Sequence, residues 1–202
     1  MATNAVTLAA PMDTKTQIIC AASKMFAQQG FDGTSIRDIV KEAGVSKPVL
    51  YYYFKNKEDL YISIIHEAYE FMFKTIREII ESGSDFMDRL RLLTHFYLEG
   101  TTQFEDIVRL IYSAAFGASR NHPKVDILQL ELTHTRLLEV FFAEGMNAGL
   151  IRSLPLEHVV LQYTGLISNY ISFFLLSGDP LPEQTEEMII TLLIDGIGAK
   201  AS

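Results

Sequence analysis

Residues 47–57 combine tyrosine hydroxyls with positive charges in a pattern that suits contact with phosphates. The segment reads KPVLYYYFKNK, so four aromatic rings stand in a row with lysines on both sides. On a helix, successive side chains point about 100° apart, so three neighbouring tyrosines cannot all face a core. Leu50 and Phe54 can share the inward stripe, which leaves the tyrosines on outward stripes. Their hydroxyls can donate to phosphates, and their rings can pack on sugars or thymine methyl groups.

Two acid–histidine pairs have spacings that could hold a metal ion, but both motifs are incomplete. Glu131 and His134 form Glu-x-x-His, which helical di-iron proteins carry twice together with two further glutamates. His66 and Glu70 would share a helix face, but the zinc motif His-Glu-x-x-His needs a second histidine. The chain also has no Gly-x-Ser-x-Gly motif and no phosphate-binding loop. We therefore expect no metal, no cofactor and no enzymatic activity.

The composition is typical of an all-α protein with a sizeable core. The chain has 202 residues, of which 49% are hydrophobic, with 12 Gly and 6 Pro. The single cysteine, Cys20, excludes an internal disulfide, and we expect it to be a small buried side chain in a cytoplasmic protein. The most apolar stretch, residues 154–176, is interrupted by polar side chains and is a poor membrane span.

The charge is divided unevenly along the chain, which has a net charge of −8. Residues 1–60 hold seven Lys and Arg against six Asp and Glu, a balance of +1, and residues 61–202 carry −9. An asymmetry of this kind suggests that the N-terminal part meets a polyanion. The basic excess is small, so we do not expect strong electrostatic binding to nucleic acid of any sequence.

Local signals divide residues 13–60 into short helices. The N-caps that we expect are Asp13, Thr34 or Ser35, Ser46 and Asn56, with Asp59 returning a bond at the last of them. Gly30 and Gly44 are expected to end the first two helices, and Pro48 lies in the first turn of the third, where proline is tolerated. Two short helices joined by a turn containing glycine form a helix-turn-helix, whose second helix enters the major groove of DNA.

The block from Thr14 to Ile65 resembles the DNA-binding region of the TetR family of bacterial repressors. The resemblance is carried by IICAASKMFAQQGFDGTSIRDIVKEAGVSKPVLYYYFKNKEDLYISII, which follows the family pattern without a gap. It implies an all-α homodimer with nine or so helices per chain. We expect a disordered N-terminal arm over residues 1–12, a three-helix DNA-binding domain over 13–60, and an effector-binding and dimerisation domain over 61–202. A basic arm is absent, because residues 1–12 contain no Lys or Arg.

The resemblance also implies which side chains touch DNA. By position, Thr34, Ser35 and Arg37 match second-helix contacts, and Lys57 matches a phosphate contact. Along the recognition helix the expected DNA-binding residues are Lys47, Pro48, Val49, Tyr51, Tyr52 and Tyr53. Arg37 is the best candidate for reading a base, because arginine fits guanine in a fork geometry.

The remaining two-thirds of the chain reads as long helices separated by Gly- and Pro-containing turns. We expect helices over about 57–81, 85–103, 105–119, 125–148, 156–176 and 183–199. The helix from Leu156 is apolar most of the way round, so it must be buried on several sides. The resemblance implies that the last two helices form a four-helix interface with a partner chain, and a homodimer supplies the second side.

A ligand pocket is expected among the middle helices, where aromatic side chains carry polar tips or edges. The candidates are Tyr69, Phe73, His95, Phe96, Tyr112, Phe116, His134, Tyr163 and Tyr170. Such residues also occur as ordinary core, and Arg109 and Arg136 have acids nearby that make surface pairs the simpler interpretation. The pattern points to a small, mostly hydrophobic effector.

Three functional hypotheses follow. The first is a ligand-responsive repressor that leaves a palindromic operator on double-stranded DNA when its effector binds. The second is a DNA-binding protein without an effector, acting as an activator or in chromosome organisation, and side chains that fill the middle helices would distinguish it. The third, least favoured, is a helical metal-binding enzyme.

Overall fold

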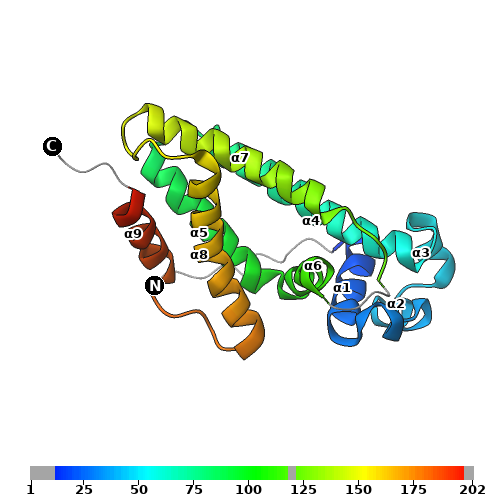
Figure 1. The fold of residues 1–202 in the computed structure, drawn as a ribbon. Helices are drawn as coiled ribbons and strands as arrows, with labels where there is room; N and C mark the ends of the chain where they lie inside the picture. The colour runs from blue at the N-terminus through cyan, green and yellow to red at the C-terminus, as the bar shows by residue number, and fades with distance from the viewer. Residues whose placement is uncertain (1–11, 118–121, 198–202) are drawn as a thin grey trace, which may run out of the picture. The chain divides into compact units, whose positions relative to one another are not determined.

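The computed structural model describes residues 12–117 and 122–197 (Figure 1). Within these residues the chain forms nine α-helices and no strand. The helices are α1 (Thr14–Gly33), α2 (Ile36–Glu42), α3 (Lys47–Tyr53), α4 (Lys57–Ile80), α5 (Phe86–Gln103), α6 (Glu105–Phe116), α7 (Ile127–Asn147), α8 (Leu156–Ser177) and α9 (Thr185–Ile197). Apart from Met12, the expected N-terminal arm lies outside the described residues.

The helix ends follow the capping signals closely. Asp13 accepts a bond from the Thr16 amide, and Asn56 accepts one from the Asp59 amide. The Asp59 carboxylate accepts a bond from the Lys55 amide rather than from the amide of Asn56 itself. Gly30 differs from our expectation, because it breaks the helical geometry at φ 71° and ψ 174° while the chain resumes helix as far as Gly33.

The described chain folds into two compact units that are interleaved in sequence. Unit 1 comprises residues 1–66 and 110–125, and unit 2 comprises residues 67–109 and 126–202. The first change of unit lies close to the expected domain boundary at residues 60 and 61. The sequence did not indicate that residues 110–125 fold with the N-terminal part. Helices α4 and α6 each begin in one unit and end in the other.

Unit 1 is built around α1, α2 and α3, which pack against one another (Figure 1). Its core contains the fully buried side chains of Ile18, Ile39 and Leu50 together with Phe26 and Tyr61, whose rings meet edge to face at 5.3 Å. Cys20 does not join this core, although we expected it to be buried. It lies on the exposed face of α1 because Ile18, Ala21 and Ala22 take the inward positions.

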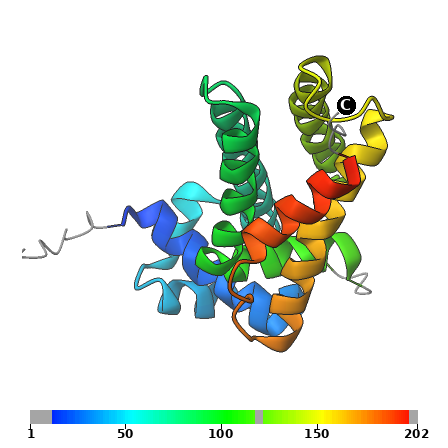
Figure 2. The same ribbon diagram turned by 90° about the vertical axis from the view of Figure 1, so that its left-hand side faces the viewer.

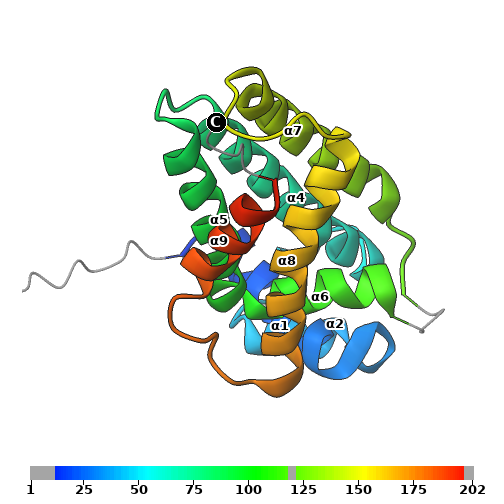
Figure 3. The same cartoon turned by 60° about the vertical axis from the view of Figure 1, so that its left-hand side comes forward.

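Unit 2 is a bundle in which α8 contacts α5, α7 and α9. Figures 2 and 3 show α9, in red, lying against α8, in yellow to orange. Phe86, Phe141 and Phe142 form a buried ring cluster, with Phe86 stacked on Phe141 at 4.7 Å. Gly145 makes room for this cluster, because a Cβ at that position would come within 2.6 Å of the Phe86 ring.

Candidate nucleic-acid interface

The two helices α2 and α3 form the expected helix-turn-helix. Ser35 caps α2 by accepting a bond from the Asp38 amide at 3.2 Å. Gly44 turns the chain between the helices at φ 67°, a conformation that side chains with a Cβ rarely adopt. Ser46 is the extended N-cap residue of α3 as expected, but its side chain makes no capping bond; Pro48 falls in the first turn as expected. This local chemistry sets the direction of α3 relative to α2.

Helix α3 separates its side chains into a buried edge and an aromatic outer face. Leu50 and Phe54 are buried, as the spacing predicted. Tyr51 is 51% exposed, Tyr52 is 82% exposed and Tyr53 is 39% exposed, and the rings of Tyr52 and Tyr53 meet edge to face at 4.9 Å. Lys47, Pro48 and Val49 are exposed on the same short helix. The outer face of α3 therefore offers hydroxyl donors, one ammonium and apolar ring surface together.

At the start of α2 the three expected contacts have different environments. Arg37 and Ser35 are exposed, and the Ser35 hydroxyl donates to the Asp38 carboxylate. Thr34 is only 2% exposed, and its hydroxyl lies 2.8 Å from the carbonyl of Gly30 and 3.2 Å from that of Met25. The Thr34 side chain is thus a support for the corner between α1 and α2, and the expectation that it contacts DNA does not fit its burial.

Lys57, expected to bind a phosphate, is half-buried and bonded inside unit 1. Its ammonium donates to the carbonyl oxygens of Phe31 at 2.7 Å and Thr34 at 2.9 Å. The same Nζ lies 4.1 Å from the centre of the Phe31 ring. The sequence contains no local signal for this contact, because the partners are more than twenty residues away.

A second basic side chain of unit 1 is also committed to a protein partner. Lys24 on α1 donates to Glu42 of α2 at 2.6 Å. The hydrogen bond and the charge of Lys24 lower the pKa of Glu42. Both side chains are about half exposed, so this pair adds little stability.

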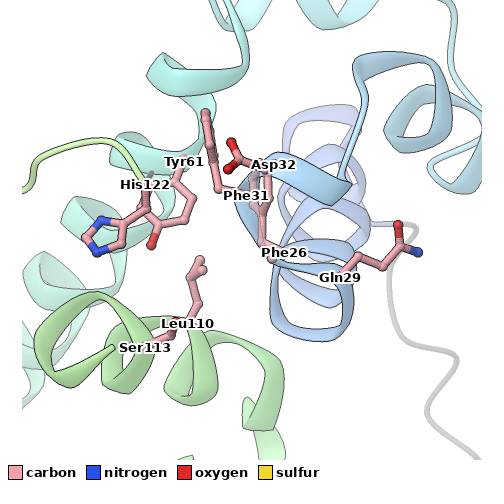
Figure 4. Close-up of a pocket in the computed structure, with 9 residues that line it drawn as sticks. Phe26, Gln29, Phe31, Asp32, Tyr61, Leu110, Ser113 and His122 are labelled. Atoms are coloured by element: carbon pink, nitrogen blue, oxygen red, sulfur yellow. The ribbon is translucent and has the colours of Figure 1, made fainter. Parts of the chain in front are cut away.

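A cavity of about 190 Å³ lies within unit 1, behind the end of α1 (Figure 4). Its wall includes Phe26 and Phe31 from α1, Tyr61 from α4, Leu110 from α6, and His122. The His122 ring stacks on Tyr61 at 6.2 Å, and burial raises the pKa of Tyr61. In Figure 4 the Gln29 amide points away from this space. None of the expected effector residues lines the cavity.

The expected effector residues are divided between the two units. Tyr112 and Phe116 belong to unit 1, where their rings meet at 5.9 Å and Phe116 is 81% exposed. In unit 2, Tyr69, Phe73, His134 and Tyr163 are buried, Phe96 and Tyr170 are half-buried, and His95 is exposed between Glu99 and Glu186. Arg136 is exposed, and Arg109 pairs with Glu105 while donating to the Leu175 carbonyl at 2.6 Å.

A hydrogen-bonded chain of polar groups in unit 2 joins the half-exposed Glu131 to Tyr69 and to His134, and His134 to Tyr97. Tyr69 donates to Glu131, a second oxygen of Glu131 lies 3.6 Å from His134, and His134 bonds Tyr97 at 2.6 Å. Burial acts to raise the pKa of Glu131, but the bonds from His134 and Tyr69 outweigh it, so this pKa is lowered. Burial raises the pKa of Tyr97 well above its ordinary value. In the part of the chain that the structure covers, no three acid, histidine or cysteine side chains come together as metal ligands.

Tyr97 and Thr94 were not among the expected effector residues, although both take part in this polar interior. The Thr94 hydroxyl lies 3.1 Å from that of Tyr163, and the rings of Tyr97 and Tyr163 meet at 6.2 Å. The only sequence signal was their place on the apolar stripe of the helix from Asp85, which is typical of core as much as of a pocket.

Known proteins similar to this chain are bacterial regulators. Residues 18–64 match the family model described as "Bacterial regulatory proteins, tetR family". The chain is 36% identical over 138 residues to the fatty acid metabolism regulator protein of Bacillus subtilis (strain 168), which covers 67% of this chain and 70% of that protein. It is 28% identical over 158 residues to the probable HTH-type transcriptional regulator YttP of the same organism, covering 77% of this chain and 76% of that protein.

The fold is also similar to solved structures. One is the transcriptional regulator FadR from Bacillus subtilis, crystallised in complex with stearoyl-CoA. The likeness has a TM-score of 0.72 and covers 90% of this chain and 98% of that chain, at 22% sequence identity. At this level of identity the comparison concerns the fold alone.

Proposed function

This chain belongs to the TetR family of bacterial regulatory proteins and is a ligand-responsive, DNA-binding transcriptional regulator, and we propose that it represses transcription from a palindromic operator. The observation that carries the proposal is the outer face of α3, where Tyr51, Tyr52 and Tyr53 are exposed beside Lys47. We propose that α3 enters the major groove and that α2 crosses the backbone, with Arg37 reading a base and Ser35 holding the register. Pro48 and Val49 offer apolar contact to the groove.

We propose a homodimer formed through α8 and α9. One face of α8 is buried in unit 2. Its other side exposes Leu161, Phe173 and Leu176, and α9 exposes Met188 and Leu192. A run of exposed apolar side chains on two neighbouring helices is typical of a surface that another protein covers. A two-fold dimer would bring the same patch of both copies together and place two copies of α3 on successive major grooves.

Helix α8 also has the length and mean hydropathy, 1.4, of a membrane span, with a third of its most apolar window buried. Its outer face carries Gln162, Ser168 and Asn169 between the apolar side chains. Polar groups at these positions are costly in lipid but ordinary in a wet protein interface. They support dimerisation rather than insertion into a membrane.

We propose that the effector binds in unit 2, near the polar chain formed by Tyr69, Glu131, His134 and Tyr97. Apolar walls with a few convergent polar groups suit a ligand that is mostly hydrophobic. Because FadR of Bacillus subtilis was crystallised with stearoyl-CoA, a long-chain acyl thioester is the first class to test. The effector would favour a dimer whose two α3 helices no longer match grooves about 34–36 Å apart, and operator affinity would fall by its differential affinity for the two states.

One observation favours a regulator that needs no effector. Phe141, Phe142 and Tyr163 are fully buried in the middle of unit 2, where their rings fill space between α7 and α8. A ligand would have to displace such packed side chains. Under this second hypothesis, operator binding would not respond to acyl thioesters or other small molecules.

The experiment is selection of bound duplexes from a random pool by the purified protein at moderate salt. We expect an inverted repeat to be enriched, and we expect stearoyl-CoA to release the protein from that repeat. Retention that simply fades with salt, without any enriched sequence, would contradict a sequence-reading repressor. If the protein selects a repeat and stays bound to it at saturating stearoyl-CoA, the acyl effector is contradicted and the proposal that the protein reads a DNA sequence stands.

A further inference from the structure

We propose that Lys57 acts as a positioning residue for DNA reading, which anchors the corner between α1 and α2, rather than as a phosphate contact. The inference rests on the proposed function, because the corner that it holds leads directly into Ser35 and Arg37. The observation is the pair of bonds from the Lys57 ammonium to the carbonyls of Phe31 and Thr34, at 2.7 and 2.9 Å.

The geometry ties the first turn of α4 to the start of α2. Phe31 lies in the last turn of α1, and Thr34 is the residue immediately before the α2 cap, Ser35. The Phe31 carbonyl accepts one bond from the Thr34 amide at 3.3 Å, and a carbonyl oxygen has a second lone pair with which it can accept from the ammonium. A cation is also favoured at the C-terminal end of a helix. Through Thr34, Lys57 fixes where Ser35 and Arg37 stand relative to the N-terminal end of α4.

The corner is also held by the Thr34 hydroxyl, which bonds the carbonyls of Gly30 and Met25 in α1, but neither of these bonds reaches α4. Gly30 interrupts α1 with a left-handed backbone, so the turn from Gly30 to Gly33 is not held by one continuous helix. Phe31 is only half-buried, and it borders the cavity shared with Phe26, Tyr61 and Leu110 (Figure 4). Where packing leaves a void, the wall loses the contacts that would otherwise hold it. The Lys57 bonds and the contact of its Nζ with the Phe31 ring therefore tie this corner to α4, together with the edge-to-face contact of Phe31 with Tyr61 at 5.4 Å.

The same geometry limits what Lys57 can give to DNA. An ammonium has three donors, and two of them are committed to carbonyl oxygens inside unit 1. Lys47 and Lys55 are exposed in the same unit, so they provide matched comparisons for a lysine that faces solvent.

The test compares Lys57→Met with Lys47→Met, using the selected operator and an unrelated duplex over a range of salt concentrations. A positioning role predicts that Lys57→Met lowers operator affinity by about tenfold, leaves affinity for the unrelated duplex nearly unchanged, and keeps the salt slope of the wild type. Lys47→Met should instead lower the slope by about one for each operator half-site. Retained binding of the unrelated duplex also reports that the Lys57 variant is folded.

A fall in the salt slope for Lys57→Met equal to that of Lys47→Met, with equal losses on both duplexes, would overturn the proposal in favour of a phosphate contact. If Lys57→Met does not fold, the same comparison is made with Lys57→Gln, whose side chain keeps two hydrogen-bond donors and lacks the charge. If Lys57→Gln keeps the operator affinity of the wild type and loses one unit of slope, the proposal is also wrong. Failure of the wild type to select any operator would count against the proposed function and not against the anchor. The anchor would then be tested without DNA, by comparing the hydrogen exchange of the amides of Thr34–Arg37 in the free variant and the free wild type. Unchanged exchange there would refute the anchor.

Discussion

Arg89 is a buried cation in the described part of unit 2, and it pairs with a residue far away in the sequence. Arg89 is 6% exposed, and its guanidinium bonds both the Ile80 carbonyl and the carboxylate of Glu144. The hydrogen bond from Arg89 lowers the pKa of Glu144, and the same bond raises the pKa of Arg89. The pair joins residues 55 positions apart, so no local spacing in the sequence could indicate it.

We expect Glu144→Gln to reduce the free energy of unfolding at pH 7 by about 1–2 kcal/mol, because a buried guanidinium loses its counter-charge while Glu144 is half exposed to screening water. A lowered folded-state pKa means that this contribution is present above the ordinary range of a carboxyl group. It disappears as the pH falls through the lowered pKa. Thermal unfolding at pH 7 and in acid should therefore show a difference between variant and wild type that shrinks in acid. Glu78→Gln, which removes an exposed pair with Lys74, is the control and should have little effect.

Arg37 is the residue for which a base contact is expected. Replacing it with Ala should lower affinity for the selected operator by about 1–3 kcal/mol and relax the preference at one base pair of each half-site. Binding measured on a panel of single-base operator variants will show this. Arg77→Ala, at an exposed position near the end of α4, is the control. Equal weakening on every sequence in the panel would assign Arg37 to a phosphate instead.

At the scale of elements, local chemistry accounts for most of the helix boundaries. Asp13, Ser35, Asn56 and Asp85 cap helices as their types suggest, and Gly178 ends α8 with a left-handed backbone. Burial of Leu50 and Phe54 was predictable from helical spacing. The internal bonds of Thr34 and Lys57, and the polar chain from Tyr69 to Tyr97, depend on contacts between elements, which sequence periodicity does not encode.

The break in α1 yields a prediction about that element. Gly30 adopts φ 71° and ψ 174°, a region that is nearly restricted to glycine, and a Cβ there would meet open space. Gly30→Ala should therefore destabilise the protein through backbone strain alone, by about 1–3 kcal/mol. Gly33→Ala is the matched control in the same helix, because its Cβ would make an ordinary contact at 3.4 Å. Equal melting temperatures for the two variants would contradict this explanation.

At the scale of the whole molecule, the exposed apolar face of α8 and α9 suits a dimer, and the charge of −8 does not favour binding to DNA of any sequence. We expect Leu161→Arg to shift the purified protein from dimer to monomer, because it places a charge in the proposed apolar interface. Light scattering coupled to size exclusion measures the mass directly. Leu128→Arg on α7, at a side chain of similar exposure, should leave the dimer intact. Dissociation by Leu128→Arg alone would move the interface to α7.

The interleaving of the two units sets a condition on how this regulator can be re-engineered. Residues 110–125 belong to the same unit as the helix-turn-helix, and Leu110 is buried in it. A hybrid that transplants residues 13–66 onto another effector domain would leave that hydrophobic wall behind and replace it with foreign side chains. Grafting the operator preference of this protein therefore requires transplanting residues 110–125 as well, a second segment that begins within α6.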